Sequence, residues 1–248
     1  MTVNPYAPPT PGDETQSHFY KTVVKNLTVA ELWRILSPNL FNFAIGLIVK
    51  TFRLNLPLYN AFAFADLIRV EFDAVPESVS NYFERARIDL RALGYSPLFS
   101  IFVPMLGEGE LYAQVFIGPK RDRVAGCIYA RTVSGMVEEV TTAVSISSRS
   151  NDGKIHTTTN SRKHLNPPPS VEWLRQTNAG MHKLDQAHTS SIGRLPWNSL
   201  VEFNIDSAWK LLIDNAEIEV DFNVGRGIYC PITDDEFAHL RKISYFSR

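Results

Sequence analysis

The sequence predicts an α+β protein whose centre is an antiparallel meander sheet of about six strands crossed by one long helix. Three observations predict this class: a series of alternating apolar segments, short connections between them, and flanking segments with helical periodicity. The connections permit only antiparallel neighbours, because a parallel crossover needs a dozen or more residues. N-terminal and C-terminal helices are expected to flank this sheet.

The expected sheet begins at 67–72, where apolar and charged residues alternate. Five further strands are predicted at 98–103, 111–117, 124–131, 137–147 and 155–159. Asp152 and Gly153, between the last two strands, are a strong hairpin signal. Apolar residues occupy both faces of the strands at 98–103 and 111–117, so the sheet should be covered on both sides or line a cavity on one.

The clearest expected helix runs from Glu77 to Leu93, where an apolar stripe recurs at helical spacing. Pro76 precedes it, and Gly94 is placed to end it in the left-handed conformation. We expect this helix to lie across one face of the sheet. A shorter helix is predicted to begin at Thr28, because Thr28 and Glu31 have the spacing of a capping box.

The segment 40–52 is apolar around most of its helical circumference, and its narrow polar side consists of Asn42, Gly46, Lys50 and Arg53. Such a helix is expected to be surrounded by protein, because wide apolar arcs usually indicate burial. The alternatives are an in-plane membrane helix with a basic edge and a surface for self-association. The segment is too short to span a bilayer.

The proline-rich segment at 166–169 breaks the chain, and the sequence after it is expected to be mainly helical. Helices are predicted at 170–174, at 179–190, at 199–220 after a capping box of Ser199 and Glu202, and after Thr233. The expected organisation is a disordered tail at 1–16, an N-terminal helical segment at 17–64, an α+β sheet domain at 65–165, and a C-terminal helical region at 166–248 that packs on the sheet.

Composition excludes several classes of protein. The 248 residues carry a formal net charge of −1, so the basic excess of duplex nucleic-acid-binding proteins is missing. Two cysteines, Cys127 and Cys230, are too few for a disulfide scaffold or a four-cysteine zinc site. Residues 1–16 lack the basic and apolar regions of a signal peptide, so we expect a cytoplasmic protein, with peripheral membrane contact as an open alternative.

Three polar residues, His182, Asp185 and His188, recur at every third position of an expected helix. They are a weak candidate for a metal site or a hydrolase, because common zinc pairs on helices are spaced four apart. A solvated polar face is the simpler interpretation. His156 and His164 flank a run of threonines that is more typical of a β-strand than of a nucleophile. We therefore expect no metal, and no cofactor because phosphate-binding loops are lacking.

Basic residues gather in two loops and at the end of the apolar helix. The candidates for one patch that binds anionic lipid or phosphate are Lys50, Arg53, Lys120, Arg121, Arg123, Arg162 and Lys163. The alternative is a set of charges that solvate turns.

The favoured hypothesis is a non-enzymatic binding or interaction module. Its apolar surface or cavity would take a small apolar molecule, a membrane surface or a protein partner. The alternatives are a hydrolase that uses His182, Asp185 and His188, and a homodimeric scaffold with peripheral membrane contact. Duplex nucleic acid is not expected as a partner.

Overall fold

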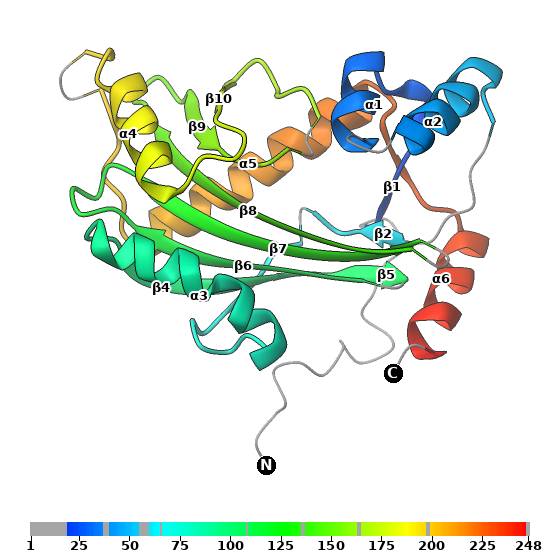
Figure 1. Cartoon of the computed structure of the whole chain (residues 1–248), viewed down its shortest axis with the longest axis horizontal. Coiled ribbons are helices and arrows are strands. Elements are labelled where there is room, and N and C mark those ends of the chain that lie inside the picture. The colour runs from blue at the N-terminus through cyan, green and yellow to red at the C-terminus, as the bar shows by residue number, and fades with distance from the viewer. Residues whose placement is uncertain are drawn as a thin grey trace.

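The computed structural model is α+β and contains, in the residues that it describes, six α-helices and two mostly antiparallel sheets (Figure 1). The described residues are 19–36, 40–54, 60–64, 66–107, 109–134, 137–162, 165–196 and 199–246. The predicted tail at 1–16 lies outside them, as do Lys163 and His164.

The larger sheet has seven strands in the order β10-β9-β8-β7-β6-β4-β3. They are β3 (Ile68–Val70), β4 (Ser96–Val103), β6 (Gly109–Ile117), β7 (Val124–Ser134), β8 (Val137–Arg149), β9 (Ile155–Thr159) and β10 (Val171–Arg175). Each of the six predicted strands has its counterpart here, paired with its neighbours as a meander. The predicted helix at 170–174 is wrong, because this segment is strand β10 and runs parallel to β9. Val171 and Trp173 alternate with polar residues, and the connection from β9 is long enough for a parallel crossover.

A second, four-stranded sheet was not predicted. Its order is β11-β1-β2-β5, and its strands are β1 (Tyr20–Thr22), β2 (Asn60–Phe62), β5 (Met105–Gly107) and β11 (Tyr229–Pro231). Strands of three residues give too few positions for an alternating pattern unless the flanking residues extend it, as they do at 67–72. This sheet joins the N-terminal segment, the central region and the C-terminal region, so these three predicted parts share one sheet.

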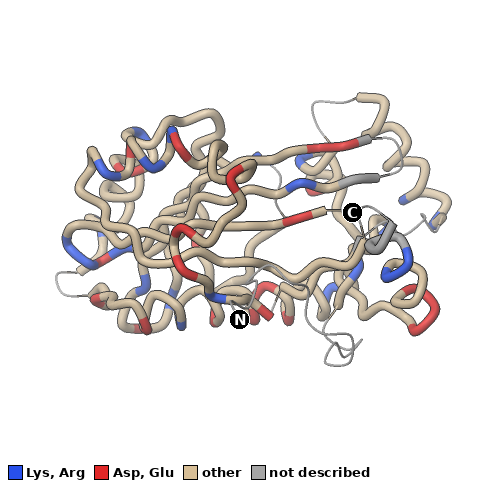
Figure 2. The backbone as a smooth tube through the Cα atoms, turned by 90° about the horizontal axis from the view of Figure 1, so that it is seen from below, with Lys and Arg blue, Asp and Glu red and all other residues tan. Residues whose placement is uncertain are grey.

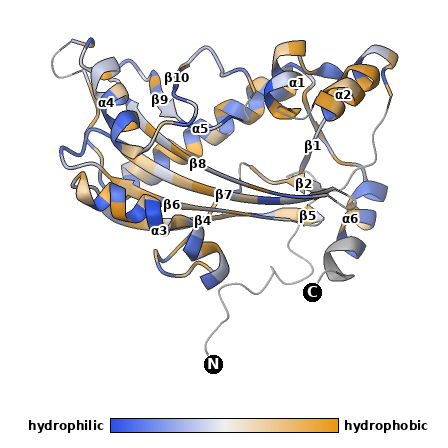
Figure 3. Ribbon diagram, viewed as in Figure 1, coloured by the Kyte–Doolittle hydropathy of each residue, from blue (hydrophilic) through white to orange (hydrophobic). Residues whose placement is uncertain are grey.

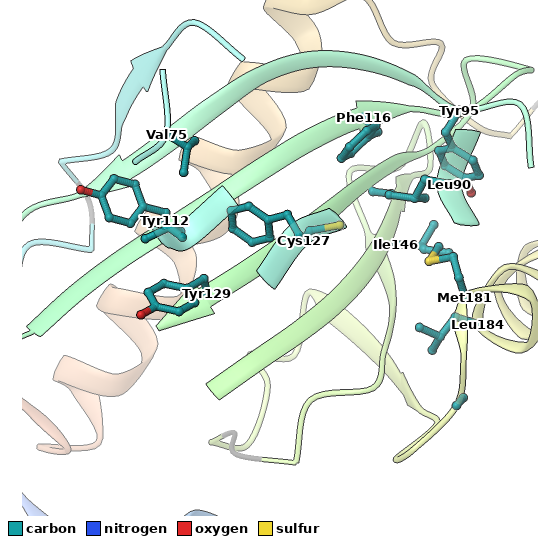
Figure 4. Packing of buried hydrophobic residues seen from close by; sticks show 14 residues of the cluster. Val75, Leu90, Tyr95, Tyr112, Phe116, Cys127, Tyr129, Ile146, Met181 and Leu184 are labelled. Carbon is teal, nitrogen blue, oxygen red and sulfur yellow. The ribbon is translucent and has the colours of Figure 1, made fainter. Parts of the chain in front are cut away.

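Both faces of the seven-stranded sheet are covered. On one face, helices α3 (Glu77–Ala92) and α4 (Met181–Ile192) pack on buried residues that include Phe116, Cys127 and Ile146 (Figure 4). On the other face, helix α5 (Ile205–Gly225) packs on a separate apolar cluster. The sequence left two alternatives for such a sheet, cover on both sides or a cavity on one, and the structure places helices over both sides.

Helix α5 begins later than predicted. Asn204 is its N-cap: the Asn204 side chain accepts hydrogen bonds from the amides of Asp206 and Ser207, at 3.0 and 2.8 Å. The predicted cap at Ser199 is wrong, because the chain from Ser199 is extended and Val201 donates to the carbonyl of Arg149. The last helix, α6 (Asp234–Phe246), follows the Thr233 position that the sequence predicts.

Helices α1 (Val29–Leu36) and α2 (Leu40–Phe52) form a pair at one end of the molecule (Figure 1). The capping box at the start of α1 is confirmed, since the Glu31 amide donates to Thr28 Oγ1 at 3.1 Å and the Thr28 amide donates to Glu31 Oε2 at 2.9 Å. Gly46 brings α2 close to α1, because a Cβ there would lie 2.6 Å from Leu36 Cδ1. The pair is therefore tightly packed on its inner side.

Candidate functional sites

The basic residues predicted to form one patch lie at two ends of the molecule. Lys50 and Arg53 are at the α2 end, whereas Lys120 and Arg121 are in the turn between β6 and β7, at the end that carries α4 (Figure 1). Acidic positions are interspersed with the basic ones (Figure 2). The structure therefore does not bring the predicted patch together.

Three of these basic residues are also bound within the protein: Lys50, Arg162 and Arg123, which is described below. Lys50 Nζ donates to the carbonyl oxygen of Leu27 at 2.5 Å, which ties α2 to the chain before α1. Arg162 donates to the side chain of Asn178. By contrast, the exposed Arg53 guanidinium has no hydrogen bond or ion pair with the part of the chain that the structure describes. Arg53 is thus available to an external anion.

Arg123 and Asp185 belong to a hydrogen-bonded polar cluster between the sheet and α4, which we call the polar seam. Its other members include Tyr95, Thr189 and His188. The Arg123 guanidinium donates to Asp122 at 2.8 Å, to Asp185 at 3.2 Å and to Thr189 at 2.6 Å. The Tyr95 hydroxyl donates to Asp185 at 2.6 Å. These contacts hold α4 on the sheet, and they engage the carboxylate that the metal and hydrolase hypotheses need.

His188 is buried in the same seam. Its Nε2 lies 2.9 Å from Ser148 Oγ and its Nδ1 lies 3.0 Å from Thr158 Oγ1. Burial lowers the pKa of His188 to about 4, so the imidazole is neutral at neutral pH. His182, on the same helix, is exposed. No three His, Cys, Asp or Glu side chains among the described residues are arranged to hold a metal ion.

A serine–histidine–carboxylate arrangement occurs at the β8–β9 hairpin. His156 Nδ1 lies 3.3 Å from Glu172 Oε2, and His156 Nε2 lies 3.3 Å from Ser150 Oγ. Ser150 is buried, and the single proton of its hydroxyl is directed to Asp152, with the Lys154 carbonyl oxygen also within 3.1 Å, rather than to the imidazole. A nucleophilic serine must be reachable and must give its proton to the histidine. This arrangement stabilises the hairpin and gives the hydrolase hypothesis no support.

The most exposed apolar surface is on α2. Leu40, Phe41 and Phe52 are 69%, 72% and 70% exposed, and Ile45 and Ile48 lie beside them. We call these five residues the α2 face; Figure 3 shows the apolar character of this helix. At about 100° per residue they occupy one sector of roughly 140°. The prediction that α2 is a core helix is therefore wrong for this sector, because only the opposite side packs on α1.

The segment that carries the α2 face is predominantly basic. Residues 19–54 contain five basic residues and one acidic residue, Glu31. The Glu31 side chain is fully buried and pairs with Arg226 at 2.7 Å. Helix α2 itself contains no acidic residue. Lys21 of this segment pairs with Glu236. This end of the molecule therefore combines an exposed apolar sector with a segment that has a basic surplus.

Comparisons with known proteins add no relative: no family model, curated protein or solved structure matches the chain. Among the described helices, none combines the length and the apolar character needed to cross a membrane.

Proposed function

We propose that the protein binds the surface of anionic membranes through the α2 face. The observation that carries this proposal is the exposure of Leu40, Phe41 and Phe52 on one side of a helix that lies in a segment with a basic surplus. In-plane membrane helices have this combination, because the apolar sector enters the acyl region while basic groups contact lipid phosphates.

The dimensions of α2 suit an in-plane position. Its 13 residues give a length of about 20 Å, too short to cross a bilayer but enough to lie along its surface. The Lys50 hydrogen bond to Leu27 fastens the opposite side of the helix to the protein. The α2 face can therefore enter lipid without unfolding of the helical pair.

A second copy of the chain is a less favourable occupant of the α2 face. A two-fold dimer would place this surface against itself, and the positive surplus of residues 19–54 would then face a second positive surplus. Anionic lipid neutralises the same charges. Charge complementarity therefore favours the membrane.

Sedimentation with lipid vesicles tests the proposal. The wild-type protein should bind vesicles of phosphatidylcholine with phosphatidylserine and lose binding at high salt. The double substitution Phe41→Gln and Phe52→Gln should weaken binding about 100-fold, since each ring contributes roughly 1.5 kcal/mol of apolar burial. Arg53→Gln should weaken binding about fivefold, and only on vesicles that contain phosphatidylserine.

Ile88→Gln is the matched control, because Ile88 on α3 is also an exposed apolar residue, 56% exposed, away from α2. This variant should bind vesicles as the wild type does. The proposal is wrong if the α2 double variant keeps its vesicle binding. It is also wrong if light scattering shows a dimer that the same two substitutions convert to a monomer.

A further inference from the structure

Gly126 lies in the middle of the seven-stranded sheet, where a glycine weakens pairing. It is on β7, the central strand, and pairs in unbroken register with Val115 of β6 and Ser145 of β8. A glycine inside a strand usually marks a bulge, a bend, or a place where another group approaches the backbone closely. The unbroken register excludes a bulge, and Gly126 is not among the residues with positive φ.

The space in front of Gly126 is open. A Cβ placed on Gly126 would meet no atom within 4 Å. Gly109, at the start of the neighbouring strand β6, gives the contrast, because a Cβ there would lie 2.6 Å from the carbonyl oxygen of Arg131. Close packing therefore explains Gly109 but not Gly126, and the open space in front of Gly126 leaves room for a ligand.

The open space is on the α5 side of the sheet. Gly126 shares its face with Ile128, which packs in the cluster under α5. On this face Gly126, Ile128 and Ala130 are half-buried, whereas Cys127 and Tyr129 on the α3 side are fully buried. Between Gly126 and Ala130, water therefore reaches the central strand from the α5 side.

The side chains that flank Gly126 on this face of the sheet are mostly apolar: Val115 is paired with it and Ile128 lies two residues along β7. Leu111 of β6 and Leu212 and Ile218 of α5 belong to the same cluster and are half-buried. Ser145 is also accessible, and its hydroxyl donates to Thr159 Oγ1 at 2.8 Å, which satisfies its hydrogen-bonding capacity as a donor. An alkyl chain can therefore lie here without burying an unsatisfied donor.

One row of paired residues leads from Gly126 to a cation. Gly126 pairs with Ser145, Ser145 with Thr159, and Thr159 with Arg175 on β10. Residues paired in this way share one face of the sheet. Three strand spacings of about 4.8 Å place the backbone of Arg175 roughly 14 Å from Gly126.

Arg175 has no carboxylate partner within the described ranges. Its Nη2 donates to the carbonyl oxygen of Leu165 at 3.4 Å, and its buried Nε has no hydrogen-bond partner there. Burial and the nearby Arg34 lower the pKa of Arg175 to about 10, so the guanidinium still carries its charge at neutral pH. A partly buried guanidinium is most favourable next to an anion, and it fits carboxylates particularly well.

We propose that the α5 side of the sheet between Gly126 and Arg175 is a binding site for a single-chain amphiphile with a carboxylate head. The alkyl chain lies in the open space at Gly126, against Ile128 and Ile218. The carboxylate faces Arg175. This site is separate from the α2 face and does not depend on membrane binding.

The test follows the fluorescence of cis-parinaric acid, with palmitate and hexadecanol as competitors, on the full chain. Gly126→Val fills the open space and should weaken binding of the probe at least tenfold. Its melting temperature should be equal to or above that of the wild type, because valine favours strands and meets no clash. Arg175→Gln should remove the preference for palmitate over hexadecanol.

Gly126→Ala is a milder filling that should weaken binding less than Gly126→Val does. Wild-type affinity in both Gly126 variants would overturn the proposal, as would equal competition by palmitate and hexadecanol on the wild-type protein. The Phe41→Gln and Phe52→Gln variant should bind the probe normally, and Gly126→Val should still bind vesicles. These reciprocal controls separate a failure of this site from a failure of the α2 face.

Discussion

The two faces of the seven-stranded sheet differ in how completely they are covered. On the α3 and α4 side, Phe116 and Leu184 are fully buried, and the polar seam around His188 has its hydrogen bonds satisfied. On the α5 side, Gly126 faces open space and Arg175 has an unsatisfied buried Nε. Open space and unmet polar groups cost stability. The first face therefore stabilises the fold, while the second retains features that suit a ligand.

The largest expected effect is at Phe116, on the side of the sheet that α3 and α4 cover (Figure 4). Phe116→Ala should lower the free energy of unfolding by about 3–5 kcal/mol, because it removes a fully buried ring and leaves a cavity. Ile128→Ala on the half-buried α5 side should cost less than about 2 kcal/mol. Urea denaturation measures both, and equal losses would mean that the two faces are packed alike.

His188, on the α3 and α4 side of the sheet, should make the free energy of unfolding sensitive to acid. Burial lowers its pKa from 6.5 to about 4, so the folded state disfavours the protonated form. The contribution to stability, on the order of 3 kcal/mol, is present above pH 6.5 and is lost as the pH falls through about 4. His188→Gln cannot take up this proton, so its unfolding energy should change less between these two pH values. If the free energy of unfolding falls equally in both proteins between these two pH values, His188 is not the source of the acid sensitivity.

Glu219 on α5 gives the opposite pH response. Burial raises its pKa from 4.5 to about 7, and no ion pair with the described residues offsets this. Folding thus favours the protonated carboxyl, and its contribution, at most about 3 kcal/mol, is present below pH 4.5 and lost as the pH rises through 7. Glu219→Gln should be more stable than the wild type at about pH 8 and similar at about pH 4. Equal stability at both pH values would show that Glu219 is well solvated.

The elements that the sequence predicts correctly are those with long periodic patterns. The stripe of α3 and the alternation in β6 and β7 each extend over nine or more residues, so local periodicity is sufficient to identify them. Strands β1, β2, β5 and β11 have three residues each, and only tertiary pairing defines them. Strand β10 resembles a short helix in sequence, because five residues show too little of either period.

The sites were harder to predict than the fold, because they depend on what a side chain faces. Periodicity shows that α2 is apolar around most of its circumference, but protein and lipid bury apolar residues equally well. Gly126 looks like a turn residue or a weak strand position until its surroundings are known. Arg175 directly follows the segment 170–174 that the sequence predicts to be helical, and its place in a row with Gly126 follows only from the parallel pairing of β10.

The smallest expected effect concerns the start of α5, the helix on the side of the sheet that contains Gly126. Asn204→Ala removes the side chain that accepts from the amides of Asp206 and Ser207, so it should cost about 1 kcal/mol. Ser199→Ala should cost nothing or stabilise slightly, because the Ser199 hydroxyl is buried and has no hydrogen-bond partner in the described structure. Thermal unfolding of the two variants measures the difference. A larger loss at Ser199 than at Asn204 would mean that α5 begins at the earlier capping box.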